Sequence, residues 1–122
     1  MADTRKSVLD EQFKDPALSL SPEELNVLAY HRGNLKPGKY LKQDNGDITT
    51  FYGARSGIDE GVMNYPRYWN GEILSPQDAM MMVRDSGIKF PIYKDDVEAA
   101  SREKVIHDIM NSDVAAFKKK NR

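Results

Sequence analysis

The side chains with the widest chemical repertoire in this sequence are two histidines, His31 and His107. They fall in separate predicted helices, and neither has an acidic partner at the spacing of a metal-binding motif. His31 lies at a helix end, where a positive charge interacts favourably with the helix dipole, and His107 flanks the apolar stripe of the last predicted helix. A shared metal site requires the fold to bring the two together, so we expect no metal ion.

Two pairs of carboxylates, Asp59-Glu60 and Asp95-Asp96, are the next candidates for chemistry. They fall at a predicted turn and a predicted helix start, where solvation and capping account for them without acid–base catalysis. The chain has no cysteine, which excludes disulfides and thiolate chemistry, and its glycines match no phosphate-binding pattern. We predict that the protein is not an enzyme and uses no cofactor.

Aromatic and basic residues give two further candidate surfaces. Tyr65, Tyr68 and Trp69 surround Arg67, and such a group stacks nucleotide bases in some single-strand binders. A half-buried sheet face is the favoured interpretation, because the neighbourhood is acidic and lacks a continuous basic groove. Arg67 and Tyr68 remain as candidate surface contacts, and the lysine run 118–120 is expected to be solvated.

Length and composition favour one soluble domain. The chain has 122 residues, a net charge of −1, 39% hydrophobic residues and 30% charged residues, so charge alone does not indicate nucleic acid as a partner. No apolar run approaches the roughly 20 residues of a membrane span, and the N-terminus lacks the apolar centre of a signal peptide. We therefore expect synthesis in a cytoplasm and no membrane partner.

Residues 1–20 are predicted to form an N-terminal arm that docks on a neighbouring protein. Four apolar side chains are spaced through this otherwise polar segment, and they are the candidate partner-binding residues: Val8, Leu9, Phe13 and Leu18. The domain itself is placed at residues 21–111. Residues 112–122 are expected to form a basic, mobile C-terminal tail.

Helix signals appear three times within the domain. Ser21, Pro22 and Glu24 form a capping box before a short helix with Leu25, Leu28 and Ala29 on one face, ending near Gly33. Ser75 begins a second helix, which Gly87 ends. Asp95 or Asp96 caps a third helix, whose apolar stripe consists of Ala99, Ile106, Ile109 and Met110.

Strand signals lie between the first two helices, separated by turns at Asn45-Gly46, Glu60-Gly61 and Asn70-Gly71. Tyr40–Gln43 and Ile48–Tyr52 are predicted to pair, Val62–Trp69 to form a third strand, and Glu72–Leu74 a short fourth; Gly53 and Gly57 are read as bulges or close approaches. The predicted fold is α+β: a three- to four-stranded antiparallel meander packed against two C-terminal helices, with an N-terminal arm and short helix.

The order of these elements resembles a small domain that recurs in tailed-bacteriophage virion-associated proteins. The resemblance covers about three fifths of the chain, from about Gly38 to Met110, and rests on Asn45-Gly46-Asp47-Ile48-Thr49-Thr50, Tyr65-Pro66, Asn70-Gly71, Ser75-Pro76-Gln77-Asp78-Ala79, Ser86-Gly87, Ala99 and His107. The chain departs from the family pattern at Arg67, where the family has threonine, and at residues 88–91, which replace a glycine-bearing segment.

The resemblance implies a setting and no catalytic residue. It implies a bacteriophage virion-associated structural or accessory protein that is made in the host cytoplasm and acts through contacts with other virion proteins. It is also compatible with a homo-oligomer. Two alternatives stay open: a nucleic-acid-binding accessory protein, and a small cytoplasmic adaptor or inhibitor made during infection.

Overall fold

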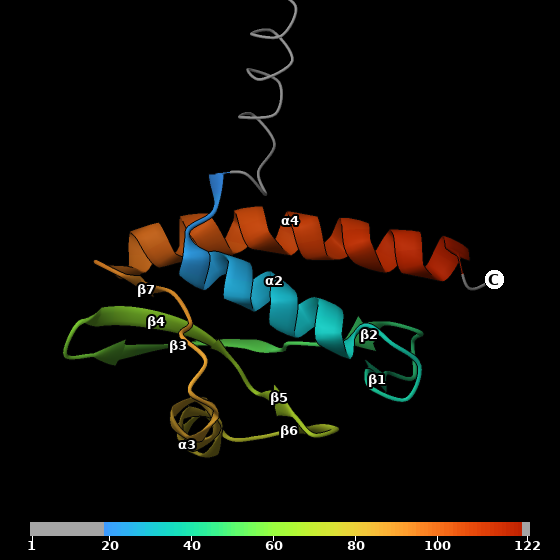
Figure 1. The fold of residues 1–122 in the computed structure, drawn as a ribbon, viewed down its shortest axis with the longest axis horizontal. Coiled ribbons are helices and arrows are strands. Elements are labelled where there is room, and N and C mark those ends of the chain that lie inside the picture. Colours follow the sequence, from blue (N-terminus) through green and yellow to red (C-terminus); the bar gives the residue numbers. More distant parts are fainter. Residues whose placement is uncertain (1–18, 121–122) are drawn as a thin grey trace, which may run out of the picture.

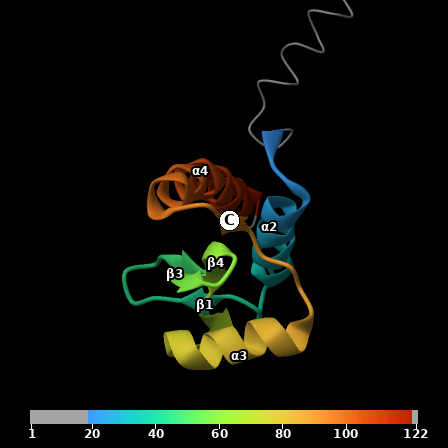
Figure 2. The same ribbon diagram turned by 90° about the vertical axis from the view of Figure 1, so that its left-hand side faces the viewer.

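The computed structural model describes residues 19–120 and belongs to the α+β class, as predicted. Its helices are α2 (Pro22–Asn34), α3 (Pro76–Ser86) and α4 (Asp96–Lys120). Its strands are β1 (Leu41–Lys42), β2 (Ile48–Thr49), β3 (Gly53–Ile58), β4 (Gly61–Pro66), β5 (Tyr68–Trp69), β6 (Glu72–Ile73) and β7 (Ile92–Tyr93). Helices α2 and α4 cover one side of the strands and α3 covers the opposite side (Figure 1, Figure 2).

All strand pairs are antiparallel, but the described strands divide among three small sheets. β1 pairs with β2, β5 with β6, and β3, β4 and β7 form the largest sheet in the order β3-β4-β7. The sequence placed the strands in one meander before the second helix, whereas β7 joins the central sheet after α3. Strand β3 contains both Gly53 and Gly57 in an unbroken register with β4, so neither glycine marks a bulge.

The glycine turns are present with different local geometries. Asn70 and Gly71 both have positive φ (51° and 86°) and join β5 to β6, as a two-residue hairpin turn requires. In the first hairpin only Gly46 has positive φ, and the Gln43 N–H donates to the Asp47 carbonyl across a three-residue loop. The turn between β3 and β4 consists of residues 59–60, whereas the predicted turn was Glu60-Gly61, one position later.

The caps of the helices confirm the sequence analysis. The Ser21 hydroxyl accepts from the Glu24 N–H at 3.1 Å and the Glu24 carboxylate accepts from the Ser21 N–H at 2.9 Å, which completes the capping box. The Ser75 hydroxyl accepts from the N–H of Asp78, and Gly87 ends α3 in the left-handed conformation. The Asp95 carboxylate caps α4 by accepting from the Glu98 N–H.

The buried face of α2 differs from the predicted one. Its buried residues are Glu24, Val27, Leu28 and His31, which follow i, i+3, i+4, i+7 spacing, while Leu25 and Ala29 are exposed. The helix also continues past Gly33 to Asn34, with Leu35 as its C-cap. Arg102 and Asp113 of α4 lie opposite Glu24 and His31 and supply polar contacts for them. Glu24 and His31 therefore occupy inward positions that were predicted for Leu25 and Ala29.

Helix α4 continues well beyond the predicted domain boundary. It runs to Lys120, so most of the expected tail is helical and one of its residues, Asp113, pairs with Arg32 of α2 at 2.8 Å. The contact explains the length of the helix, because it holds the last turns of α4 against α2. No helix within residues 19–120 is long and apolar enough to cross a membrane.

The core lies between the helices and the strand layer and is centred on aromatic rings. Tyr30 contacts the rings of Phe51, Trp69 and Phe90 edge-on, with centroids 5.0–5.9 Å apart. The buried apolar cluster consists of Leu20, Val27, Leu28, Phe51, Tyr65, Trp69, Ala79, Val83, Phe90, Ile106 and Met110. Leu20 was assigned to the arm, and it belongs instead to this core.

Candidate functional site

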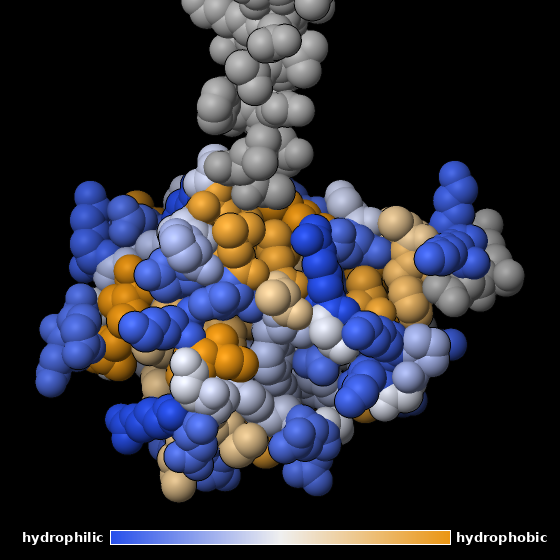
Figure 3. Space-filling view, viewed as in Figure 1, coloured by the Kyte–Doolittle hydropathy of each residue, from blue (hydrophilic) through white to orange (hydrophobic). Residues whose placement is uncertain are grey.

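The described residues form a groove of about 1310 Å³. It is lined by the start of α2, the β3–β4 turn, part of β4, α3, the start of α4, and the segment 87–93, which follows α3 and includes β7. Figure 3 shows apolar surface near β7 and the β3–β4 turn at the left and again at the centre, with charged side chains between.

Apolar side chains line the groove together with an equal number of polar or charged ones. The apolar side chains are Leu20, Ile58, Met63, Met80, Val83, Ile88, Phe90, Pro91, Ile92 and Tyr93. Ile92 is 42% exposed, whereas Phe90 and Tyr93 are buried and anchor the segment. Met80 packs on the core and Met81 is exposed.

Gly61 sets the position of β7, and so of one wall of the groove. Its φ is +144°, and a Cβ at this position would lie 2.2 Å from the Tyr93 carbonyl oxygen. Only glycine combines that backbone conformation with so close an approach. The β4–β7 pairing therefore depends on Gly61. In the sequence this glycine was identified only as part of the predicted turn at Glu60-Gly61.

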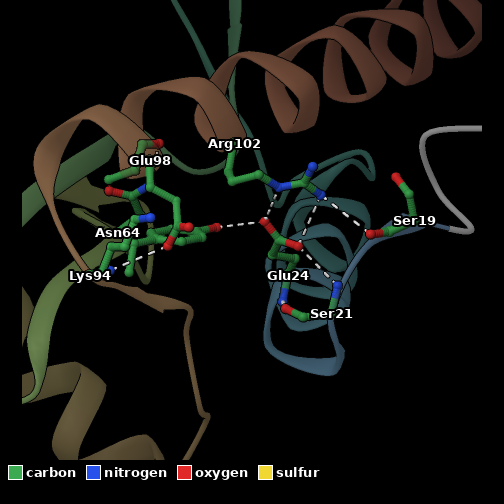
Figure 4. A network of polar contacts seen from close by, with 9 residues as sticks. Ser19, Ser21, Glu24, Asn64, Lys94, Glu98 and Arg102 are labelled. Atoms are coloured by element: carbon green, nitrogen blue, oxygen red, sulfur yellow. Dashed lines mark hydrogen bonds and ion pairs between the residues drawn. The ribbon is translucent and has the colours of Figure 1, made fainter.

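A buried carboxylate closes one end of the groove. Glu24 is 3% exposed, and its two oxygens accept hydrogen bonds from Arg102 Nε at 2.8 Å and Nη2 at 3.1 Å (Figure 4). The Tyr93 hydroxyl donates to the same carboxylate at 2.7 Å, and the Ser21 N–H completes its shell. Arg102 also donates to the Ser19 carbonyl at 3.4 Å, at the point where the described chain begins.

The pKa values in this cluster follow from its burial and its hydrogen bonds. Burial alone raises the pKa of Glu24, but the hydrogen bonds from Arg102, the Ser21 N–H and Tyr93, together with the Arg102 charge, lower it below 4.5. Burial and the neighbouring Glu24 carboxylate raise the pKa of the Tyr93 hydroxyl. The carboxylate is thus held ionised with all of its acceptor sites engaged, which makes it a poor proton acceptor and a rigid anchor.

A second buried cluster lies two turns further along the same face of α2, where α2 meets α4 and the segment after β2. The His31 ring is 1% exposed; its Nδ1 lies 2.5 Å from the Thr50 hydroxyl and its Nε2 lies 3.4 Å from an Asp113 oxygen. The order of hydroxyl, imidazole and carboxylate is that of a nucleophile, base and orienting acid. Thr50 is also buried, and neither residue lines the groove, so the hydroxyl has no approach for a substrate.

The buried surroundings of His31 keep its ring in the neutral form. Burial lowers the pKa of His31, and the Asp113 charge only partly opposes that shift, so the ring is neutral near pH 7. His31 Nε2 has no partner with hydrogen-bond geometry. From the sequence, His31 was expected at a helix end, where a charge favours the helix dipole; its position seven residues after Glu24, on the Val27–Leu28 face, was the signal for burial.

The predicted partner-binding residues and the two predicted surface contacts have different outcomes. Val8, Leu9, Phe13 and Leu18 lie outside the described residues. Arg67 is half-buried, donates to the Leu74 carbonyl at 2.7 Å and lies over the Tyr52 ring.

Tyr68 was proposed as a surface contact, and this is wrong. Its side chain is 1% exposed and its hydroxyl donates to the Lys39 carbonyl at 2.5 Å. The strand breaks at Arg67 and helices cover both sides of the layer, so Tyr65, Tyr68 and Trp69 are all buried instead of alternating. The expected burial of Trp69 is confirmed, with its Nε1 donating to the Pro66 carbonyl at 2.7 Å.

His31 and His107 do not form a recognisable metal site, because the described residues contain no group of three or more His, Asp or Glu side chains with metal-binding geometry. The Glu103 carboxylate forms an ion pair with Arg55 at 2.5 Å and lies 4.0 Å from His107 Nε2.

Comparison of the chain with protein-family models, with curated proteins and with solved structures returned no match.

Proposed function

We propose that this chain is a non-catalytic interaction protein that binds a segment of another protein in its groove, as a structural or accessory component of a bacteriophage particle. The observation that carries the proposal is the groove itself, whose lining combines apolar side chains such as the exposed Ile92 with charged ones, and whose buried carboxylate is already neutralised by Arg102. A site of this kind gains affinity by covering apolar surface.

The charges around the groove indicate the chemistry of the partner. Acidic side chains outnumber basic ones there once Glu24 and Arg102 are taken as a pair; those that remain are Glu23, Asp59, Glu60, Glu98, Arg84 and Lys89. An apolar segment flanked by lysine or arginine complements this surface. Nucleic acid does not, because its phosphates meet the acidic residues and the aromatic rings proposed for base stacking are buried.

The particle setting rests on the resemblance of the hairpin and helix-start motifs to a phage domain. The shape of the groove agrees with a role in which the protein binds other virion proteins. A cytoplasmic adaptor or inhibitor would use the same groove, and the location of the protein separates the two.

The test compares two substitutions in the phage that encodes the chain. Ile92 is 42% exposed and lines the groove, while Ile73 is 38% exposed on β6 and does not. Neither side chain is in the core, so Ile92→Glu and Ile73→Glu should both fold. We expect quantitative mass spectrometry of purified particles to find the wild-type and Ile73→Glu chains, and the Ile92→Glu chain depleted by roughly tenfold or more.

The controls separate the parts of the proposal. Equal incorporation of both variants would refute the groove as the binding surface while leaving the particle setting intact. Particles that lack the wild-type chain would refute the setting and favour the adaptor. Circular dichroism of both purified variants checks that the fold is unchanged.

A further inference from the structure

Strand β3 has an open edge. In the central sheet β3 pairs only with β4, and no other strand within residues 19–120 pairs with its outer side. Figure 2 shows β3 on the side of the strand layer away from α2, between the levels of α4 and α3. β3 is six residues long and has neither a bulge nor a proline, so of the usual features that prevent an edge from pairing it carries only one charged side chain, Arg55.

The backbone groups that point outward along this edge follow from one hydrogen bond. The Asn64 N–H donates to the Pro91 carbonyl at 3.1 Å, so the hydrogen-bonding groups of Asn64 point toward β7. Arg55 is the partner of Asn64 in the β3–β4 register, and such a pair directs its groups away from each other. The N–H and C=O groups of Arg55, and by the two-residue period those of Gly53 and Gly57, therefore point to the open edge.

These three positions are also the exposed ones. Gly53, Arg55 and Gly57 are exposed, whereas the alternate residues are half-buried. Two of them have no side chain, and the space where a Cβ of Gly57 would stand is open. A second backbone can approach such an edge closely.

We propose that β3 pairs antiparallel with β3 of a second copy of this chain, so that the two central sheets join into one. The charges along the strand select the register. A pairing centred on Arg55 places two arginines opposite each other, which is unfavourable. A pairing centred on Ser56 places Arg55 opposite Gly57 of the second copy, with Asp59 and Arg55 of that copy as its two diagonal neighbours, so each arginine has an acid beside it.

The register centred on Ser56 is self-complementary. By two-fold symmetry it forms the Arg55–Asp59 contact twice and aligns the outward groups of residues 55 and 57 of both copies. Arg55 already binds Glu103 and Asn64, which hold its guanidinium on the α4 face of the sheet. Asp59 is the first residue of the β3–β4 turn, directly after the strand, and in this register it stands opposite Gly53 of the other copy, one diagonal step from the arginine of that copy. The proposal does not depend on what the groove binds.

Sedimentation of the full chain over a wide range of concentrations provides the test, combined with hydrogen exchange of individual amides. We expect a monomer–dimer equilibrium in which the Gly53, Arg55 and Gly57 amides become protected as the dimer forms. A chain that stays monomeric overturns the proposal. So does protection of these amides in a monomer, because the chain's own residues 1–18 would then cover the edge.

Charge-reversed variants test the register. Asp59→Arg and Arg55→Asp should each weaken self-association roughly tenfold or more, because both symmetric contacts become repulsive. A mixture of the two variants should form a heterodimer, because both contacts are then attractive again. Glu72→Arg makes the same charge change in the exposed β5–β6 hairpin and should dimerise like the wild type. Undiminished dimerisation of Asp59→Arg, or a mixture that fails to associate, overturns the register.

Discussion

Arg102→Ala should reveal how strongly the end of the groove is held together. The substitution removes two hydrogen bonds to the Glu24 carboxylate, at 2.8 and 3.1 Å, and leaves the bonds from Tyr93 and the Ser21 N–H. Hydrogen bonds to charged groups contribute about 1.5–3 kcal/mol each. The Arg102 side chain is 28% exposed, so water replaces part of the loss, and we expect the free energy of unfolding to fall by about 2–4 kcal/mol at pH 7.

The pH dependence of this loss distinguishes an ion pair from simple packing. In the wild type the pKa of Glu24 is lowered, so its contribution to stability is complete above pH 4.5 and is lost as the pH falls through the native pKa. In Arg102→Ala that pKa is higher than in the wild type, because burial remains while the hydrogen bonds and charge of Arg102 are gone, so acid protonates the variant's carboxylate first and relieves the cost. The difference in stability between the two chains should therefore shrink as the pH falls from neutral through the variant's pKa to the native one.

Urea unfolding at neutral and acidic pH measures both quantities. Arg84→Ala is the matched control, because Arg84 also lines the groove but is exposed on α3, and it should change stability by less than about 0.5 kcal/mol. A loss for Arg102→Ala no larger than that of the control would refute the reasoning, as would a difference that does not change with pH.

Three further substitutions test the positioning of the core and the sheet. Gly61→Ala should destabilise the chain by about 1–3 kcal/mol or more, because of its +144° φ and the contact with the Tyr93 carbonyl, while Gly57→Ala should be nearly neutral in the same thermal melts. Trp69→Ala empties a buried aromatic site and should cost about 3–5 kcal/mol in urea unfolding; an unchanged melt would show that Trp69 does not support the core. The pKa of His31 is lowered in the native chain, so as the pH falls through about 6.5 the unfolded chain takes up a proton before the native chain does. The free energy of unfolding should therefore decrease as the pH is lowered from about 7 toward 5. His31→Gln should flatten that slope.

Local signals in the sequence determined the starts of α2 and α3, the end of α3 and one hairpin turn. Ser21, Ser75 and Gly87 act within a few residues of their own position, because a cap satisfies backbone groups of the adjacent turn. Asn70-Gly71 likewise determines its own hairpin through positive φ. The apolar stripe of α4 was readable for the same reason, since 3.6-residue periodicity is a property of one helix.

Tertiary structure decided which strands pair and which faces are buried. Strand β3 has the composition of a loop, and it is a strand because β4 supplies its hydrogen-bonding partner. Tyr68 is buried because α3 covers one side of the strand layer while α2 and α4 cover the other, so strand alternation gives no exposed face there.

The two polar clusters were beyond local reasoning for a different reason. Glu24 and Arg102 are 78 residues apart, and His31 and Asp113 meet only because α2 and α4 pack side by side. A buried carboxylate is stable only beside its partner, and nothing in a single helix identifies a partner on another. The sequence by itself therefore determined where the helices begin and where α3 ends, and the packing of α2 against α4 decided which of their charged residues lie inside.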